Sequence, residues 1–242
     1  MAQPDYNLTA ELLKKLAKDI ARMRVLLVDR HAGARNSLRI ILSTLGVTSI
    51  HGAGTSAEVI RQVKNNRFDI ILSDYHLDDG RDGQQLLEEL RQKHLISLAT
   101  VFIVITAERG YHNVVSVAEL APDDYLIKPF TAEQLQGRLA RAVYKKQYFA
   151  RVFEQLDRSA FVDALASCDI LLARNDPYFY DTLRFKGEIL NALGRYDEAK
   201  AVYQQVLDHA TVPWARMGLA LALRGQEQLA EAEAIGSELI ED

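Results

Sequence analysis

Residues 68–83 read FDIILSDYHLDDGRDG, and this segment decides the fold of the first half of the chain. Its opening part, residues 68–74, is an almost continuous apolar run that ends on an acidic residue. A run that is apolar on both faces is typical of a strand buried inside a parallel sheet. An amphipathic helical pattern follows over residues 82–94, so the segment predicts a strand, a loop and a helix in succession.

The same unit recurs along residues 24–147. Apolar runs alternate there with amphipathic stretches: the runs lie at 25–29, 47–53, 68–74, 100–107 and 124–130, and the stretches at 33–45, 56–66, 82–94, 111–120 and 131–148. Strands that alternate with helices predict a parallel sheet covered by helices on both faces. We therefore expect a doubly wound α/β domain with a five-stranded parallel sheet.

Both ends of the chain depart from this alternation. Residues 8–23 place leucine, isoleucine and methionine at helical spacing, so residues 1–23 are expected to supply one amphipathic helix, packed on the domain or on a second copy. Residues 148–242 contain no strand-like run, and leucine, alanine and tyrosine recur there at helical spacing. This pattern predicts an all-α domain, which follows the stretch 131–148 without a Gly/Pro-rich linker.

Composition excludes several classes of protein. The 29 basic and 33 acidic side chains give a formal charge of -4, and residues 144–242 carry a net charge of -5, so a basic surface for nucleic acid is not expected. Cys168 is the single cysteine, which excludes a disulfide framework, and we expect it in the helical core. The longest apolar stretch, residues 98–107, is too short to span a bilayer.

Four polar residues lie at the carboxyl ends of the predicted strands, where open α/β sheets bind their ligands. They are Asp29, Asp74, Thr106 and Lys128. Two carboxylates suit Mg²⁺, which binds proteins through one or two carboxylates together with phosphate oxygens. A carboxylate also acts as a nucleophile, and a lysine pairs with phosphoryl oxygens. The four residues together predict a site for Mg²⁺ and a phosphoryl group.

Residues 24–147 resemble the receiver domain of two-component response regulators through four motifs: VLLVD, ILSDYHLDDGRDG, VFIVITA and DYLIKPF. The resemblance implies a flavodoxin-like strand order 2-1-3-4-5 and a histidine kinase or phosphotransfer protein as partner. It also implies roles for individual residues: Asp74 as phosphoacceptor, Asp29, Asp74 and the backbone carbonyl of His76 as Mg²⁺ ligands, Thr106 and Lys128 as phosphoryl-binding groups, and Tyr125 as an aromatic switch. The peptide bond between Lys128 and Pro129 is expected to be cis.

Residues 148–242 resemble tetratricopeptide repeats (TPR), which are helical hairpins of 34 residues. Alanines at matching positions, Ala164, Ala199 and Ala230, are spaced by 35 and 31 residues. We expect small residues to allow close helix approach and bulky residues to fill the space between helices: Gly187, Ala199, Gly218 and Ala230 are small, and Leu183, Tyr203 and Trp214 are bulky. The resemblance implies that these repeats bind a protein or peptide. A longer repeat protein and a homodimer both remain open.

Arg30 departs from the receiver pattern, because the family usually has a second acidic residue there that binds the metal. A cation near Mg²⁺ is unfavourable, so Arg30 either points away or weakens metal binding. A third alternative is that Arg30 forms an ion pair with Asp74. That pair favours a second hypothesis, a pseudo-receiver that acts as an adaptor scaffold independently of phosphorylation. A further departure is one extra residue in the loop 78–83.

Other function classes have less support. An aspartyl phosphatase of the haloacid dehalogenase kind needs D-x-D after its first strand, where this chain has Asp29 followed by Arg30 and His31. No helix-turn-helix with a basic recognition helix follows the receiver-like part, which disfavours a DNA-binding regulator. We therefore expect a bacterial, cytoplasmic signalling protein that is not an enzyme and has no membrane span.

Overall fold

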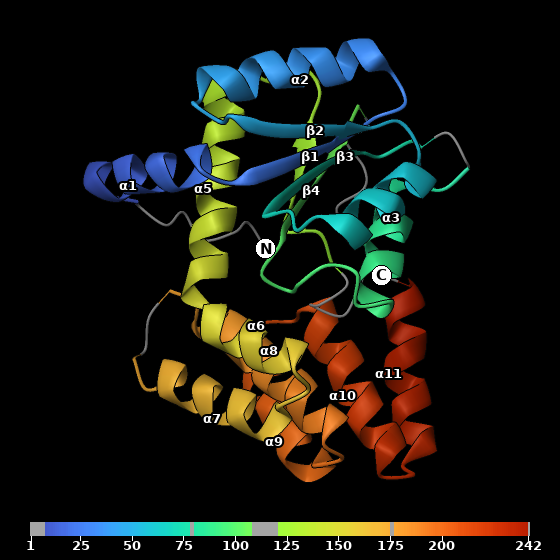
Figure 1. Cartoon of the computed structure of the whole chain (residues 1–242). Helices are drawn as coiled ribbons and strands as arrows, with labels where there is room; N and C mark the ends of the chain where they lie inside the picture. Colours follow the sequence, from blue (N-terminus) through green and yellow to red (C-terminus); the bar gives the residue numbers. More distant parts are fainter. Residues whose placement is uncertain (1–7, 78–79, 108–120, 175–176, 242) are drawn as a thin grey trace. The chain divides into compact units, whose positions relative to one another are not determined.

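The computed structural model describes residues 8–77, 80–107, 121–174 and 177–241, with side chains up to residue 237. The described residues divide into two compact units, and the division falls between Ala150 and Arg151. Figure 1 shows the α/β unit from blue to yellow and the helical unit from yellow to red. The predicted helix at 111–120 and the acidic residues Asp78 and Asp79 lie outside the described residues.

The first unit contains a five-stranded parallel sheet. Its strands are β1 (Arg24–Val28), β2 (Ser49–Ala53), β3 (Ile70–Asp74), β4 (Val101–Thr106) and β5 (Asp124–Ile127). They are arranged in the order β2-β1-β3-β4-β5, which confirms the predicted fold. The central strands β1, β3 and β4 are buried almost throughout, because their apolar side chains meet a helical layer on each face of the sheet.

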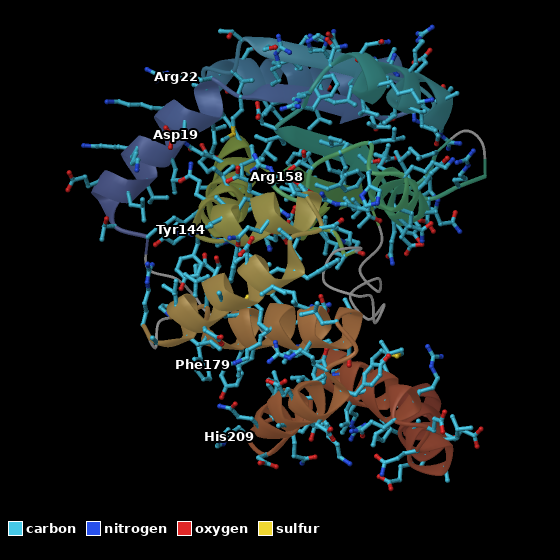
Figure 2. The ribbon with its side chains drawn as sticks, turned by 60° about the horizontal axis from the view of Figure 1, so that its bottom comes forward. Asp19, Arg22, Tyr144, Arg158, Phe179 and His209 are labelled. Atoms are coloured by element: carbon cyan, nitrogen blue, oxygen red, sulfur yellow. The ribbon has the colours of Figure 1, made fainter. Side chains whose placement is uncertain are left out.

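Helices cover both faces of this sheet. The helices that share one core cluster are α1 (Ala10–Ala21), α2 (Ala32–Thr44) and α5 (Ala132–Tyr148); those of the opposite cluster are α3 (Ser56–Asn65) and α4 (Gly83–Gln92). Helix α1 packs against α5, with Leu16 and Ile20 buried. At its surface, Gln147 of α5 donates a hydrogen bond to Asp19, which Figure 2 labels on α1. The N-terminal helix is thus part of the first unit.

Side-chain caps set the starts of three helices close to the predicted positions. Thr9 caps α1 by accepting the backbone N–H of Leu12. Asp82 and Thr131 begin α4 and α5, and each forms a capping box with the glutamine three residues later. Strand β5 ends at Ile127, earlier than the predicted run to Phe130, since Pro129 has no N–H to continue the ladder.

The second unit is all-helical, as predicted. It contains α6 (Ala150–Asp157), α7 (Phe161–Leu172), α8 (Phe179–Ala192), α9 (Tyr196–Leu207), α10 (Pro213–Gly225) and α11 (Leu229–Glu241). From α7 onward each helix packs against the next, and α8 also contacts α10 (Figure 1). Only Phe149 separates α5 from α6, so a long linker is absent from this junction.

Small residues allow close helix packing at most of the expected positions. Tyr203 of α9 is buried against Gly187 and Gly218, where an added Cβ would lie 2.6 and 2.2 Å from its ring. Cys168 is buried in α7, as expected for a core residue. The expectation for Ala230 is wrong, because this residue is exposed on α11. Ala230 therefore does not provide the close helix approach that Gly187 and Gly218 allow around Tyr203.

Among the residues described, no helix combines the length and apolar character that a membrane crossing requires.

Candidate functional site

The register of the sheet brings the predicted site residues to one edge. Val28 pairs with Ser73, so Asp29, which follows β1, and Asp74, the last residue of β3, lie at the same level. Thr106 ends β4 and lies opposite Ile127, the residue before Lys128. The carboxyl ends of β1, β3, β4 and β5 thus place two carboxylates, a hydroxyl and an ammonium in one neighbourhood.

Lys128 joins the two carboxylates. Its Nζ lies 2.7 Å from Asp74 Oδ1 and 3.4 Å from Asp29 Oδ2. The Asp29 side chain is 2% exposed and that of Asp74 13% exposed, so water screens these charges only in part. The backbone N–H of Lys128 donates to the Thr106 carbonyl at 2.7 Å, which fixes the start of the lysine side chain. The Lys128–Pro129 bond is cis, as the resemblance implies.

Asp29 is held by backbone and side-chain contacts. Its Oδ1 accepts the backbone N–H of His31 at 2.8 Å, and its carbonyl accepts Arg35 Nη1 at 2.5 Å. The same guanidinium nitrogen donates to the carbonyl of Arg30 at 3.3 Å. Arg35 was not predicted as a site residue. The only sequence signal for it is its place in the first turn of α2, the helix that follows β1.

Arg30 is exposed at the end of β1. Asp74 pairs with Lys128, and within the described parts of the chain no ion pair joins Asp74 to Arg30. Of the alternatives left open for Arg30, the ion pair with Asp74 is therefore not formed in this structure. The physical reason is that Lys128, which follows β5, already pairs with Asp74 at 2.7 Å.

The other predicted residues surround this pair. Thr106 is buried at the end of β4. Tyr125 lies half-buried on β5, and its hydroxyl donates to Gln84 Oε1 of α4 at 3.1 Å. Burial, followed by the charges of Asp82 and Glu88, raises the pKa of the Tyr125 phenol above its usual range. Tyr125 therefore stays neutral near pH 7 and links β5 to α4.

Gly83 is a site residue that the sequence reasoning missed. A Cβ at this position would lie 2.7 Å from the backbone oxygen of Asp74 and 3.2 Å from Ser73 Oγ. The Gly83 N–H also donates to the Tyr75 carbonyl at 2.7 Å. The first turn of α4 therefore rests directly on the end of β3. The sequence offered one signal for this role: a glycine at the first position of the helix, where no turn requires its conformational freedom.

The donor set at this edge fits Mg²⁺. Asp29, Asp74 and Lys128 together carry a net charge of -1, and carboxylate oxygens are the hard ligands that Mg²⁺ prefers. His76 lies in the loop between β3 and α4, where its backbone forms an isolated bridge with Asp82. Within the described residues, no group of three or more His, Cys, Asp or Glu side chains gathers as a metal site. A metal here would need backbone, water or phosphoryl oxygens as further ligands.

Comparisons with known proteins identify this part of the chain. Residues 25–140 match the family model of the response regulator receiver domain. The chain is 27% identical over 117 residues to the chemotaxis protein CheY-3 of Vibrio cholerae, covering 48% of this chain and 88% of that protein. It is 25% identical over 119 residues to CheY of Pseudomonas aeruginosa, covering 49% and 94%. A CheY-like receiver domain from Methanospirillum hungatei has a TM-score of 0.46 at 24% identity, over 52% of this chain and 97% of that chain.

Proposed function

We propose that this chain, whose residues 25–140 form a response regulator receiver domain, is a two-component response regulator that accepts a phosphoryl group on Asp74. One observation carries the proposal: Lys128 Nζ lies within 3.4 Å of both Asp29 and Asp74, with Thr106 at the end of the neighbouring strand. The arrangement supplies a carboxylate nucleophile, a cation for phosphoryl oxygens and a hydroxyl donor. The donor is a histidine kinase, a phosphotransfer protein or a small acyl phosphate.

The transfer is a displacement at phosphorus. An oxygen of the Asp74 carboxylate forms a bond to phosphorus while the bond from phosphorus to the donor breaks. With a phosphohistidine donor, the bond that breaks is P–N, and the leaving imidazole nitrogen keeps the electron pair and takes a proton from solvent. Lys128 then pairs with a phosphoryl oxygen instead of the Asp74 carboxyl group, because the negative charge of the acyl phosphate lies on its phosphoryl oxygens.

Mg²⁺ would be held by Asp29, Asp74 and the backbone carbonyl of His76, and would neutralise charge on the phosphoryl oxygens. Asp29 is already oriented by the N–H of His31 and the side chain of Arg35. Arg30 replaces an acid that the family uses here, which lowers the negative charge available to a metal. We therefore propose that Mg²⁺ binding is weak until a phosphoryl group adds its oxygens.

The output is proposed to be protein binding by the helical unit. The phosphoryl oxygens attract the Thr106 hydroxyl, the space beside Thr106 opens, and Tyr125 leaves Gln84 and turns inward. This change shifts the population between two packings of the β4, β5 and α5 region. The one-residue junction at Phe149 supports transmission toward the helical unit. The TPR class of that unit, a signalling role without enzyme activity and a bacterial cytoplasmic location are parts of the same proposal.

Intact mass spectrometry tests the proposal. The protein is incubated with acetyl phosphate and Mg²⁺, beside an Asp74→Asn variant and a sample with EDTA. We expect a gain of one phosphoryl group in the unmodified protein with Mg²⁺, and none in the variant. An unmodified protein that gains no mass under conditions that label another receiver domain refutes the phosphorylation proposal. The adaptor that acts independently of phosphate then becomes the better account.

A further inference from the structure

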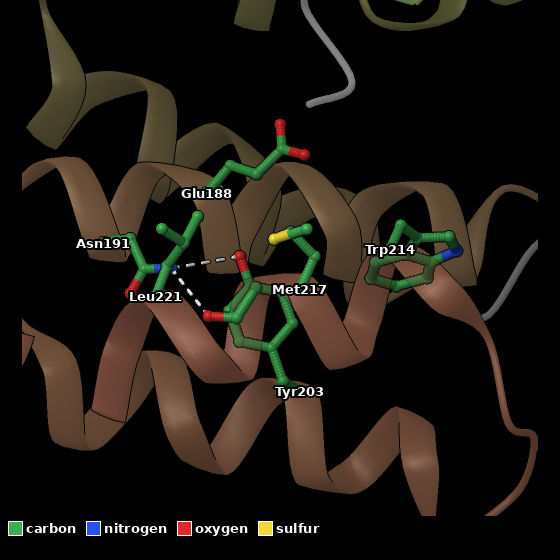
Figure 3. Close-up of a pocket in the computed structure, with 7 residues that line it drawn as sticks. Glu188, Asn191, Tyr203, Trp214, Met217 and Leu221 are labelled. Atoms are coloured by element: carbon green, nitrogen blue, oxygen red, sulfur yellow. Dashed lines mark hydrogen bonds between the residues drawn. The ribbon is translucent and has the colours of Figure 1, made fainter. Parts of the chain in front are cut away.

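A small cavity lies inside the helical unit, between α8, α9 and α10 (Figure 3). Its volume is about 100 Å³, which suits one inserted side chain better than a whole helix. The residues that line it come from all three helices: Glu188, Asn191, Tyr203, Trp214, Met217 and Leu221, together with the backbone of Gly218. None of the receiver residues discussed above contributes to it.

The floor of the cavity is a fixed tyrosine. Tyr203 is 1% exposed, and its ring fills the space that side chains at Gly187 and Gly218 would otherwise occupy. Asn191 Nδ2 donates to the Tyr203 hydroxyl at 3.4 Å and to the Gly218 carbonyl at 3.1 Å. These contacts, drawn as dashed lines in Figure 3, hold the floor in place without filling the cavity.

The walls are apolar and the rim is acidic. Met217 and Leu221 lie beside the Tyr203 hydroxyl in Figure 3, with Trp214 at one side. Burial, and next the charge of Glu188, raises the pKa of the Tyr203 phenol, so the negative charge of Glu188 is felt at the Tyr203 hydroxyl. A cavity with apolar walls, a hydroxyl floor and a carboxylate at its rim suits an alkyl chain that ends in a cation.

The chain itself places a cation at this rim. The Arg184 guanidinium lies 5.6 Å from the Trp214 ring centre, and its Nε lies 3.3 Å from Glu188 Oε1. Arg184 and Glu188 therefore form an ion pair at the rim, so an entering cation would share the Glu188 carboxylate with Arg184. The net charge of -5 on residues 144–242 attracts a basic partner to the same part of the chain.

We propose that this cavity receives a lysine side chain from a basic segment of a partner protein. The lysine stem contacts Met217 and Leu221, and its ammonium lies near the Tyr203 hydroxyl and the Glu188 carboxylate. This inference rests on the proposed protein-binding output and names the chemistry of the partner. An acidic segment, an apolar segment and a second copy of the chain are the competing occupants.

Trp214 gives a local signal for the test, since it is the only tryptophan in the chain. The full-length protein is first applied to an array of random twelve-residue peptides. Peptides that bind are then titrated in solution while Trp214 fluorescence is recorded. We expect lysine to be enriched among them. Replacing that lysine by norleucine, which keeps the alkyl stem without the charge, is expected to weaken binding at least tenfold.

Two matched variants locate the binding. Met217→Lys places a cation at the cavity from within the chain and is expected to weaken the selected peptides at least tenfold. Ile170→Lys introduces a lysine at an exposed position of α7 outside the cavity. Its affinity for the selected peptides is expected to stay within twofold of that of the unmodified protein. Glu188→Gln keeps the shape of the rim, and is expected to reduce the preference for lysine over norleucine.

Several results would overturn the inference. They are enrichment of acidic or apolar peptides, equal binding of the lysine and norleucine peptides, binding that Met217→Lys leaves unchanged, and concentration-dependent self-association without peptide binding. Acidic or apolar peptides that change Trp214 fluorescence would refute the preference for a basic partner while supporting protein binding as the output. Labelling of Asp74 by acetyl phosphate is measured on the same samples, so a failure of the phosphorylation proposal is seen separately.

Discussion

Replacing Gly83 by alanine tests whether the first turn of α4 must rest on the end of β3. The new Cβ would lie 2.7 Å from the Asp74 backbone oxygen, whereas ordinary contacts of this kind begin at 3.4 Å. Either α4 or the end of β3 must therefore shift by about 0.7 Å. The obstacle is backbone on β3 and not a flexible side chain, so it cannot move aside independently. Overpacking of this kind costs about 1–3 kcal/mol.

Gly137→Ala is the matched control in the same unit. Gly137 lies within α5, and a Cβ there would meet nothing within 4 Å. Alanine in a helix interior is favoured over glycine by about 1 kcal/mol, so this variant should be more stable than the unmodified protein. Gly83 has little of this advantage, because it is the first residue of α4. The two variants should therefore differ by about 2–4 kcal/mol in the free energy of unfolding.

Urea unfolding followed by circular dichroism measures this difference. For a slope of about 2 kcal/mol per molar urea, the two midpoints should be separated by about 1–2 M. Because the displaced group belongs to the phosphoacceptor, Gly83→Ala should also slow the labelling of Asp74 by acetyl phosphate, while Gly137→Ala should not. A Gly83→Ala protein as stable as the control, with normal labelling, would refute the close contact between α4 and β3.

Three further predictions concern buried groups. Gly218→Ala should lower the urea midpoint seen by tryptophan fluorescence, because its Cβ would lie 2.2 Å from the Tyr203 ring, whereas Gly236→Ala, with open space around it, should not. Burial lowers the pKa of the Lys146 ammonium from 10.5 to about 8, so the folded state loses this proton at a lower pH than the unfolded state does. The free energy of unfolding should therefore rise between about pH 8 and 10, and Lys146→Met should lack that rise. Burial raises the pKa of Cys168 to about 12, so a thiol reagent at pH 8 should label it slowly in the native protein and rapidly in urea.

The sheet and its site could be predicted because their signals are local. Each strand is a short apolar run that ends at a polar residue, and parallel strands bring their carboxyl ends to one edge. Asp29, Asp74, Thr106 and Lys128 could therefore be grouped without knowledge of any side-chain position. The helix start at Thr131 was equally local, because its hydroxyl and the Gln134 amide three residues later satisfy each other's backbone groups.

Contacts between distant residues could not be predicted in this way. That Lys128 reaches both carboxylates depends on the separation of three strands, which the sequence does not state. The sequence left three alternatives open for Arg30, and only the structure shows that Asp74 pairs with Lys128 while Arg30 is exposed. The role of Gly83 depends on how closely α4 approaches β3, and a single glycine in the sequence does not reveal the distance between a helix and a strand. Ala230 matched the repeat spacing, but spacing alone does not determine burial at the α11 end of the array.

The most direct test of the central claim is to locate the phosphoryl group. The protein is treated with acetyl phosphate and Mg²⁺ and then with borohydride, which reduces an aspartyl phosphate to homoserine, and the digest is analysed by tandem mass spectrometry. We predict homoserine at position 74 alone, and none when Mg²⁺ is removed by EDTA. Another receiver domain, treated in parallel, shows whether the treatment works. If that control is converted and Asp74 is not, or if homoserine is found at a different aspartate, the account is contradicted.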